Sequence, residues 1–301
     1  MLRRQHTLLL ILTLFLAIGC VLVTACSPTP QAPPETSTPT PYQAPIIHIN
    51  KPTPTASKPL PTPVGFQATN VLLLGTDRRG SGIQTNNTDT LIIFHLNPDT
   101  RQMVILSVPR DLYVEIPGHS QGRINTAYAL GQYDGTGGLE LAAETISSTL
   151  GIPIDYAALV DFRAVVTLVD AIGGVDVNVP YNISDPTYPG QGARYDPFYL
   201  AAGTHHLDGE MALKYARTRA TAGGDFDCTA RQRQLVMATR SQVLQFNLLP
   251  DLIAKSPLIW QDLQGAVETQ LTLSQIVDLA LLATRIPSDR ITLAGIDQTC
   301  T

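Results

Sequence analysis

Three apolar runs between Asn70 and Asp111 constrain the fold of this chain more than any other feature. They cover residues 70–74, 90–96 and 103–108, and turn residues fill 97–100 between the second and the third. Short apolar runs bounded by turn residues are typical of β-strands. A charged side chain lies beside an end of each run: Asp77, Asp89 and Arg110. The sequence therefore predicts strand ends that bring two carboxylates and a guanidinium together.

Two carboxylates with nearby arginines suit a divalent metal and a phosphate. One or two carboxylates hold Mg²⁺ in many phosphoryl-transfer sites, where phosphate oxygens complete the coordination. Arginine forks bind phosphate oxygens in pairs. Arginines lie at ends of elements or in turns at Arg78, Arg79, Arg110, Arg123, Arg217, Arg219, Arg231 and Arg233. They are either ordinary surface residues or parts of a pyrophosphate site with Mg²⁺ (or Mn²⁺) on Asp77 and Asp89.

Composition limits the classes of partner. The chain has 301 residues, enough for one or two domains, and 44% of them are hydrophobic, enough for a buried core. Its formal net charge is −5, which excludes the strongly basic field by which many proteins hold nucleic acid. We therefore expect no nucleic-acid partner.

Residues 1–26 have the layout of an export signal. A basic start precedes an almost uninterrupted apolar run over 8–23. The small residues before Cys26 resemble a bacterial lipobox, which implies cleavage before Cys26 and attachment of a lipid to its sulfur. An uncleaved transmembrane anchor is the alternative, because the run is close to the roughly 18 apolar residues that suggest a spanning helix. Both interpretations place the body outside the cytoplasmic membrane and anchored to it.

Residues 27–63 hold 12 of the 23 prolines, together with many threonines. Such a tract lacks the apolar residues of a core and favours extended, semi-rigid polyproline II structure. At ~3.1 Å per residue it would reach on the order of 100 Å. We expect a disordered tether between the membrane and a body that covers residues 64–301.

The body alternates predicted strands and helices, which is typical of an α/β fold. Further strands are expected at 155–160, 175–179 and 290–295. Helices are expected at 139–150, 163–172 (buried), after Asp208, at 231–246 and within 248–285. Residues 181–200 are predicted to form a long irregular loop whose aromatic side chains either line a ligand site or pack on the loop itself. Arg217 and Arg219 share one side if their segment is extended.

Eight short motifs follow one another in an order typical of one protein family. They are GTDRR (75–79), NTDT (87–90), SVPRD (107–111), RINTAY (123–128), DAIGGVDV (170–177), HLDGEMAL (206–213), YARTR (215–219) and RQ (231–232). Over about residues 70–246 they resemble the motifs of the LytR–CpsA–Psr family. Each motif alone is weak, whereas eight in order are specific. The architecture expected is a three-layer α-β-α sandwich with a mixed central sheet and a C-terminal helical extension.

The resemblance implies a bacterial cell-envelope phosphotransferase. Such enzymes move a glycopolymer from a polyprenyl-pyrophosphate carrier to a hydroxyl of peptidoglycan or another envelope glycan, with Mg²⁺, and form a phosphodiester. By motif, Asp77 and Asp89 would hold the metal, and Gln232 would assist the arginines. The arginines that would bind the pyrophosphate are Arg79, Arg110, Arg123, Arg217, Arg219 and Arg231. The catalytic group would be Asp77, Asp89, Arg110, Arg217 and Arg219, with hydrolysis of the pyrophosphate as a side activity.

One position departs from the family pattern. The family commonly has Asp-Phe-Gly-Arg where this chain has Asp-Phe-Asp-Cys at 225–228, so Cys228 replaces an arginine. Either Arg231 or Arg233 compensates, or activity is lowered. Cys228 and Cys300 form a disulfide or stay free thiols, and spacing alone does not decide between these states. Two other functions stay open: a binding protein for polyprenyl phosphates or envelope glycans without turnover, and a hydrolase of the pyrophosphate.

Overall fold

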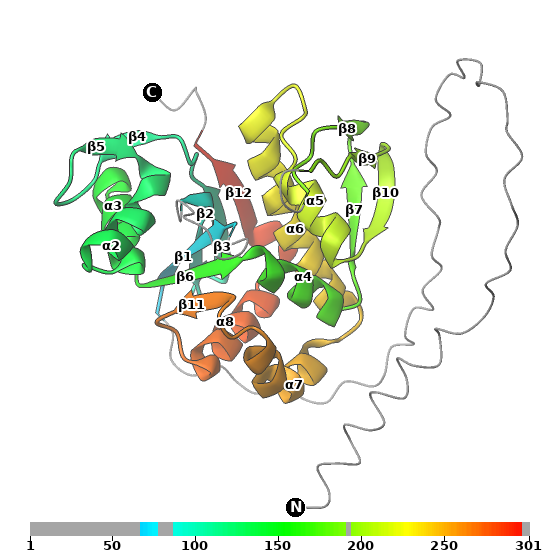
Figure 1. Cartoon of the computed structure of the whole chain (residues 1–301). Coiled ribbons are helices and arrows are strands. Elements are labelled where there is room, and N and C mark those ends of the chain that lie inside the picture. The colour runs from blue at the N-terminus through cyan, green and yellow to red at the C-terminus, as the bar shows by residue number, and fades with distance from the viewer. Residues whose placement is uncertain (1–66, 78–86, 191–193, 297–301) are drawn as a thin grey trace, which may run out of the picture. The chain divides into compact units, whose positions relative to one another are not determined.

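A computed structural model describes residues 67–77, 87–190 and 194–296 (Figure 1). Cys26, Arg79 and Cys300 lie outside these ranges, as does the proline-rich stretch 27–63. Lipid attachment and the pairing of Cys228 with Cys300 therefore stay predictions. Among the described residues, no helix combines the length and the apolar character that a membrane span requires.

The centre of the described chain is a six-stranded sheet in the order β11-β6-β1-β2-β3-β12. In that order the strands are Val267–Thr269, Tyr156–Asp161, Thr69–Thr76, Thr88–Asn97, Gln102–Ser107 and Ile291–Gly295. β2 runs antiparallel to both β1 and β3, whereas β6 is parallel to β1 and β12 is parallel to β3. The sheet is therefore mixed, and the three strands predicted between Asn70 and Asp111 are confirmed.

Helices cover both faces of this sheet (Figure 1), because side chains on its central strands are apolar on both faces. On one face, Leu72 and Leu159 pack with residues of α2 and α3. On the other face, Ile92 and Ile105 pack with residues of α6 and α8. These helices are α2 (Ala127–Asp134), α3 (Gly138–Leu150), α6 (Gly224–Gln245) and α8 (Leu273–Arg285). The three-layer sandwich is confirmed.

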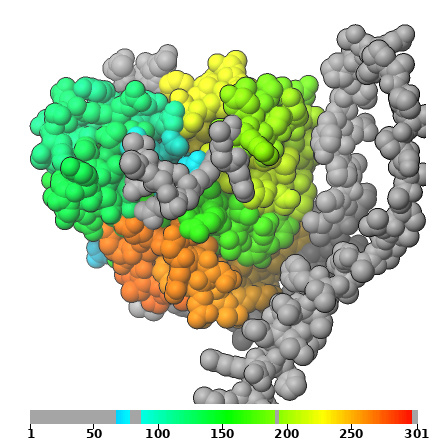
Figure 2. All heavy atoms as spheres, viewed as in Figure 1, coloured from blue at the N-terminus to red at the C-terminus, as the bar shows by residue number. Residues whose placement is uncertain are grey.

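A second core lies beside the sheet and contains residues of four strands and several helices. Its strands are β7 (Val175–Val179), β8 (Ile183–Asp185), β9 (Phe198–Leu200) and β10 (Gly203–Leu207). Its helices include α4 (Phe162–Ala171), α5 (Gly209–Arg217) and the start of α7 (Leu249–Asp262). Figure 2 shows α2 and α3 on one side of the surface and β7–β10 on the other, with α7 and α8 below. α6 contributes to both cores and so joins the two parts.

Short elements complete the described chain: β4 (Tyr113–Glu115), β5 (Gln121–Arg123), η1 (Ile124–Thr126) and η2 (Ser288–Arg290). The predicted cap of α5 is confirmed, because the Asp208 carboxylate accepts a hydrogen bond from the Met211 amide at 2.9 Å. Gly151 ends α3 in the left-handed conformation, as the sequence also indicated.

Several local predictions were wrong. Residues 181–200 contain the β8–β9 hairpin, because Ile183 and Leu200 point into the second core and pair with each other. The long helix predicted to begin at Arg231 is α6, which begins at Gly224. Arg217 ends helix α5, so the condition of an extended segment, under which Arg217 and Arg219 would share one side, is not met. The helix predicted at 163–172 begins at Phe162 and is amphipathic, with only two of its residues fully buried. Tertiary contacts, which the local pattern does not contain, decided each of these cases.

Candidate functional site

The predicted residues of the strand ends face the turn between α5 and α6. Asp77 follows β1 directly, and its carboxylate lies 2.8 Å from the Arg217 guanidinium at the end of α5. Asp89 is the second residue of β2, which is paired with β1. The strand order therefore brings the two carboxylates to one edge of the sheet, and helix α5 brings an arginine to them.

Arg217 is held in place by two aromatic residues. Its guanidinium carbon lies 3.9 Å from the centre of the Phe162 ring, a stacked cation–π contact. Its Nη1 donates a hydrogen bond of 3.0 Å to the hydroxyl of Tyr188. Tyr188 is itself buried and lies beside the Phe198 ring in the second core. The guanidinium is therefore fixed before any ligand binds, as bidentate phosphate recognition requires.

A second cluster joins β2, the loop after β3 and the start of α6. Arg110 Nη1 lies 2.5 Å from the Asp89 carboxylate, and Arg219 Nη2 lies 3.6 Å from the same oxygen. Asp225, in the first turn of α6, lies 2.5 Å from Arg219 Nε and 3.6 Å from Arg110 Nε. Two guanidinium groups and two carboxylates thus alternate around one centre.

Electrostatics within this cluster favour the charged form of Arg110. Burial lowers the pKa of the Arg110 guanidinium, but the hydrogen bond to Asp89 and the negative charges of Asp225, Asp89 and Asp111 outweigh burial, so the pKa is raised. Arg110 is therefore a permanent cation at the centre of the site.

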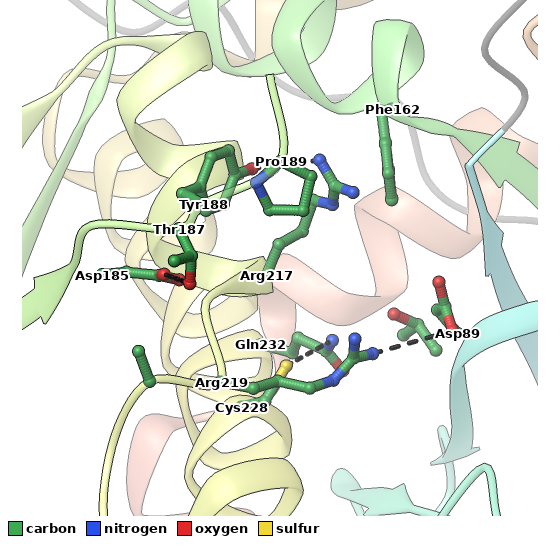
Figure 3. A pocket seen from close by; sticks show the side chains of 12 residues that line it. Asp89, Phe162, Asp185, Thr187, Tyr188, Pro189, Arg217, Arg219, Cys228 and Gln232 are labelled. Atoms are coloured by element: carbon green, nitrogen blue, oxygen red, sulfur yellow. Dashed lines mark hydrogen bonds and ion pairs between the residues drawn. The ribbon is translucent and has the colours of Figure 1, made fainter. Parts of the chain in front are cut away.

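A cavity of about 330 Å³ opens between these groups (Figure 3). Its lining residues are Asp89, Thr90, Phe162, Asp185, Thr187, Tyr188, Pro189, Arg217, Arg219, Ala220, Cys228 and Gln232. Figure 3 shows Arg217 and Arg219 entering it from the α5–α6 turn, with Asp89 on the strand opposite. Further cavities of about 460 Å³ and 190 Å³ share Arg217 and Arg219, respectively, with the first. Arg217 and Arg219 therefore each lie between two neighbouring cavities.

Arg231 lies in a different environment from the other predicted arginines. It is 4% exposed, and its guanidinium donates hydrogen bonds to the carbonyl oxygens of Tyr215 and Thr218. It does not line the cavity described above. Its donors bind backbone and hold the turn that carries Arg217 and Arg219. Its role as a pyrophosphate ligand stays a prediction.

The remaining predicted residues differ in their positions. Gln232 lines the cavity and donates to the carbonyl oxygen of Ala216 at 3.3 Å. Arg123 ends β5, is largely exposed and lies 3.3 Å from Asp111, a residue beside Arg110. Arg79 lies outside the described residues.

Sequence reasoning missed Phe162 and Asp225 as parts of the site. Tyr188 belongs to the segment 181–200, whose aromatic side chains were predicted either to line a ligand site or to pack on the loop, and Tyr188 lines the cavity and also packs beside Phe198. Asp225 stands three residues before the family departure at Cys228, which was a detectable signal. No sequence signal pointed to Phe162, because a single phenylalanine at the start of a helix is usually a core residue.

Cys228 is 3% exposed and carries a free thiol in the described chain, and this thiol donates to the Ala216 carbonyl oxygen at 3.1 Å. Burial raises the pKa of this thiol. The residue lines two of the three cavities. At the position where the family commonly has an arginine, this chain therefore has an uncharged side chain that lines the cavity.

Among the described residues, no group of three or more acidic, histidine or cysteine side chains forms a metal cage. Asp77 and Asp89 are nevertheless suited to a cation, because they bring two hard carboxylates to one sheet edge beside arginines. Mg²⁺ in phosphoryl-transfer sites often has only one or two protein carboxylates. The donor set therefore fits a metal that shares its coordination with a substrate phosphate.

Comparison with known proteins identifies the fold family. The sequence profile of the LytR_cpsA_psr family matches residues 50–299. The chain is 34% identical over 213 residues to TagU of Oceanobacillus iheyensis, named a polyisoprenyl-teichoic acid–peptidoglycan teichoic acid transferase. That alignment covers 70% of this chain and 62% of the relative, so the chain spans less than two thirds of that protein. It is also 34% identical over 204 residues to LcpB of Corynebacterium glutamicum, a probable cell wall biosynthesis protein, covering 64% and 46% of the two chains.

Solved structures agree with this assignment. TagV of B. subtilis superposes with a TM-score of 0.60 at 29% identity, covering 77% of this chain and 85% of TagV. YwtF (TagT), solved with bound octaprenyl pyrophosphate, gives 0.54 at 26% identity, covering 76% and 77%. The family profile, the relatives and the shared mixed sheet give one answer: the chain belongs to the LytR_cpsA_psr family.

Proposed function

We propose that this protein transfers a glycopolymer from a polyprenyl-pyrophosphate carrier to a hydroxyl of an envelope glycan, such as peptidoglycan, and forms a phosphodiester. The acceptor oxygen attacks the phosphorus that bears the glycopolymer, the bond from this phosphorus to the bridging oxygen breaks, and polyprenyl monophosphate leaves. One observation carries the proposal: three arginines that line neighbouring cavities are each paired with a carboxylate. Arg217 pairs with Asp77, Arg110 with Asp89, and Arg219 with Asp225. A pyrophosphate can take over these contacts, because its negatively charged oxygens accept paired hydrogen bonds from a guanidinium, as a carboxylate does.

The relatives support this choice of substrate. TagU is named as a teichoic acid transferase, and TagT was solved with octaprenyl pyrophosphate. Arg217 and Arg219 follow one another in a single turn, so they would bind neighbouring phosphoryl oxygens from one side. Arg110 would bind from the opposite side, from the loop after β3.

We further propose that Asp77 and Asp89 hold Mg²⁺ or Mn²⁺. Such an ion, when bound, neutralises charge that develops on the transferred phosphoryl group. In the structure, each of these carboxylates forms an ion pair with an arginine, Asp77 with Arg217 and Asp89 with Arg110. As ligands of a cation they would leave Arg217 and Arg110 to the phosphate oxygens, so cation and pyrophosphate should bind cooperatively. One of the two carboxylates would also help to deprotonate the acceptor hydroxyl.

We infer that the protein works outside the cytoplasmic membrane, anchored by a lipid on Cys26 or by an uncleaved apolar segment. The export-signal layout of residues 1–26 supports this location. A polyprenyl carrier is itself a membrane lipid, so an anchored body with a long tether would reach its headgroup.

The experiment uses geranyl pyrophosphate as a short carrier. We expect release of inorganic phosphate in Mg²⁺ and none in EDTA. Asp89→Asn and Arg110→Ala should each lower the rate by about a hundredfold or more, because each removes charge at the reacting group. Lys255→Ala, on the exposed face of α7, is the matched control and should retain the wild-type rate.

Supplying a lipid-linked glycan and a peptidoglycan acceptor separates the functional classes. Transfer to the glycan supports the proposed function. Phosphate release without any transfer would make the protein a hydrolase. Tight binding with neither reaction would make it a binding protein for polyprenyl phosphates, and either result would overturn the proposal.

A further inference from the structure

Asp185, the last residue of β8, places a buried carboxylate at the cavity of about 330 Å³. The residue is 6% exposed. Its carboxylate accepts hydrogen bonds from two hydroxyl groups, Thr218 Oγ1 at 2.7 Å and Thr187 Oγ1 at 3.4 Å, and Figure 3 shows Thr187 beside it. A negative charge in a cavity lined by arginines opposes the binding of an anion there. Its presence at this place therefore indicates a role that outweighs this repulsion.

The sequence around Asp185 builds a tight turn. Residues 185–188 read Asp-Pro-Thr-Tyr, and a type I turn favours aspartate at its first position and proline at its second. The turn closes because the Tyr188 amide donates a hydrogen bond of 3.3 Å to the Asp185 carbonyl oxygen. The Tyr188 hydroxyl in turn accepts a hydrogen bond from Arg217. The backbone of Asp185 is thus connected to Arg217 through a single residue.

The side chain of Asp185 is connected to the same region through Thr218, which stands between Arg217 and Arg219. Thr218 is 1% exposed, and its amide closes the last turn of α5. Its hydroxyl donates to Asp185, and its carbonyl oxygen accepts a hydrogen bond from Arg231. Three contacts from three elements therefore fix the one residue that separates the two arginines.

The conformation of Thr218 determines where the two arginines point. Its φ of −57° and ψ of 139° take the chain out of the helix, so the arginine before it is helical and the one after it is not. Arg217 consequently reaches Asp77, whereas Arg219 reaches Asp225. An anion that binds both guanidinium groups depends on this separation, because bidentate contacts tolerate little misplacement.

We propose that Asp185 is a positioning residue, which fixes the backbone between Arg217 and Arg219 through the Thr218 hydroxyl and so sets the separation of the two guanidinium groups. The inference rests on the proposed function and adds a residue that acts without touching the substrate. A carboxylate suits this role because both of its oxygens accept, one from Thr218 and one from Thr187.

A double-mutant cycle tests the connection between Asp185 and Thr218. The rate of phosphate release from geranyl pyrophosphate in Mg²⁺ is measured for Asp185→Ala, Thr218→Val and the double variant. Each single substitution should lower kcat/KM about tenfold, because it frees the backbone between the arginines. The double variant should lose no more than either single one, since both act through the same hydrogen bond. Losses that multiply to about a hundredfold would overturn the positioning role.

Binding of geranyl pyrophosphate, measured by calorimetry, gives a test in which the sign decides. A carboxylate that acted only through its charge would repel the ligand, and Asp185→Ala would then bind more tightly. We expect the opposite, a loss of affinity of about threefold to tenfold. Asp185→Asn keeps one acceptor oxygen for the Thr218 hydroxyl and should stay within about threefold of the wild type. Tighter binding by Asp185→Ala would overturn the proposal.

Thr145→Val is the matched control for Thr218→Val. Thr145 is also buried, and its hydroxyl donates to the Leu141 carbonyl oxygen at 2.7 Å within α3. Its loss should lower the melting temperature as in Thr218→Val and leave kcat/KM unchanged, while Thr218→Ser, which keeps the hydroxyl, should retain most of the activity. An equal kinetic loss in Thr145→Val would show general destabilisation and overturn the proposal. A wild-type protein that neither binds geranyl pyrophosphate nor releases phosphate would instead overturn the proposed function.

Discussion

The Arg217 guanidinium lies 2.8 Å from the Asp77 carboxylate and 3.9 Å from the centre of the Phe162 ring. The ion pair joins residues that stand 140 positions apart. It connects the end of α5 to the end of β1 and so closes the site between the two cores.

Arg217→Lys tests the geometry of this contact. A lysine keeps the charge but loses the planar fork and the stacking on Phe162. We expect phosphate release from geranyl pyrophosphate to fall about a hundredfold, with the melting temperature within a few degrees of the wild type. Arg290→Lys, at the edge of the sheet, is the control. Full activity in Arg217→Lys would mean that charge alone suffices and that the fork has no role.

Phe162→Leu tests the aromatic support of Arg217. The ring fixes the guanidinium, and an exposed or half-buried cation–π contact contributes about 0.5–1 kcal/mol. We therefore expect affinity for geranyl pyrophosphate to fall about threefold to fivefold in Phe162→Leu and to stay near wild type in Phe162→Tyr. The two variants are compared by titration calorimetry. Equal losses in both would show that side-chain volume, and not the aromatic face, matters.

Arg231→Met tests whether Arg231 stabilises the turn between α5 and α6. Three carbonyl or hydroxyl acceptors around its guanidinium would lose their partner, namely Tyr215, Thr218 and Thr221. Hydrogen bonds to a charged group contribute about 1.5–3 kcal/mol, so the free energy of unfolding should fall by about 2–4 kcal/mol. Urea denaturation measures this, with Lys255→Met as the exposed control. Unchanged stability together with lost phosphate binding would place Arg231 in the pyrophosphate site.

The lowered pKa of the Asp227 carboxyl predicts that the folded state loses stability in acid. Hydrogen bonds from Thr221 and Tyr181 lower the pKa of this carboxyl. A carboxyl whose pKa is lower in the folded state stabilises the fold above its unfolded pKa of about 3.9 and loses that contribution as the pH falls through the folded value. The melting temperature of the wild type should therefore drop more between about pH 6 and pH 3 than that of Asp227→Asn.

The control for this prediction is Asp262→Asn, at the exposed end of α7. Its acid-dependent drop should match that of the wild type. Equal drops in all three proteins would show that the hydrogen bonds of Asp227 do not stabilise the start of α6.

The positions of three central strands along the chain could be predicted from local patterns. Three apolar runs separated by turn residues predict β1, β2 and β3, and Asp77, Asp89 and Arg110 follow from where those runs end. Such strands need only period-two patterning and turn chemistry, both of which are encoded within a few residues. The order of the motifs also indicated the family without any structure.

The sequence by itself thus determined the family, the mixed α/β class and the charged residues available for a phosphate site. Only the tertiary structure decided which of those residues share a cavity. Arg217 and Arg231 look alike in sequence, yet the first meets Asp77 and Phe162 while the second is buried against backbone carbonyls. The physical reason is that burial and hydrogen-bond partners depend on contacts between segments far apart in the chain, which no local pattern contains.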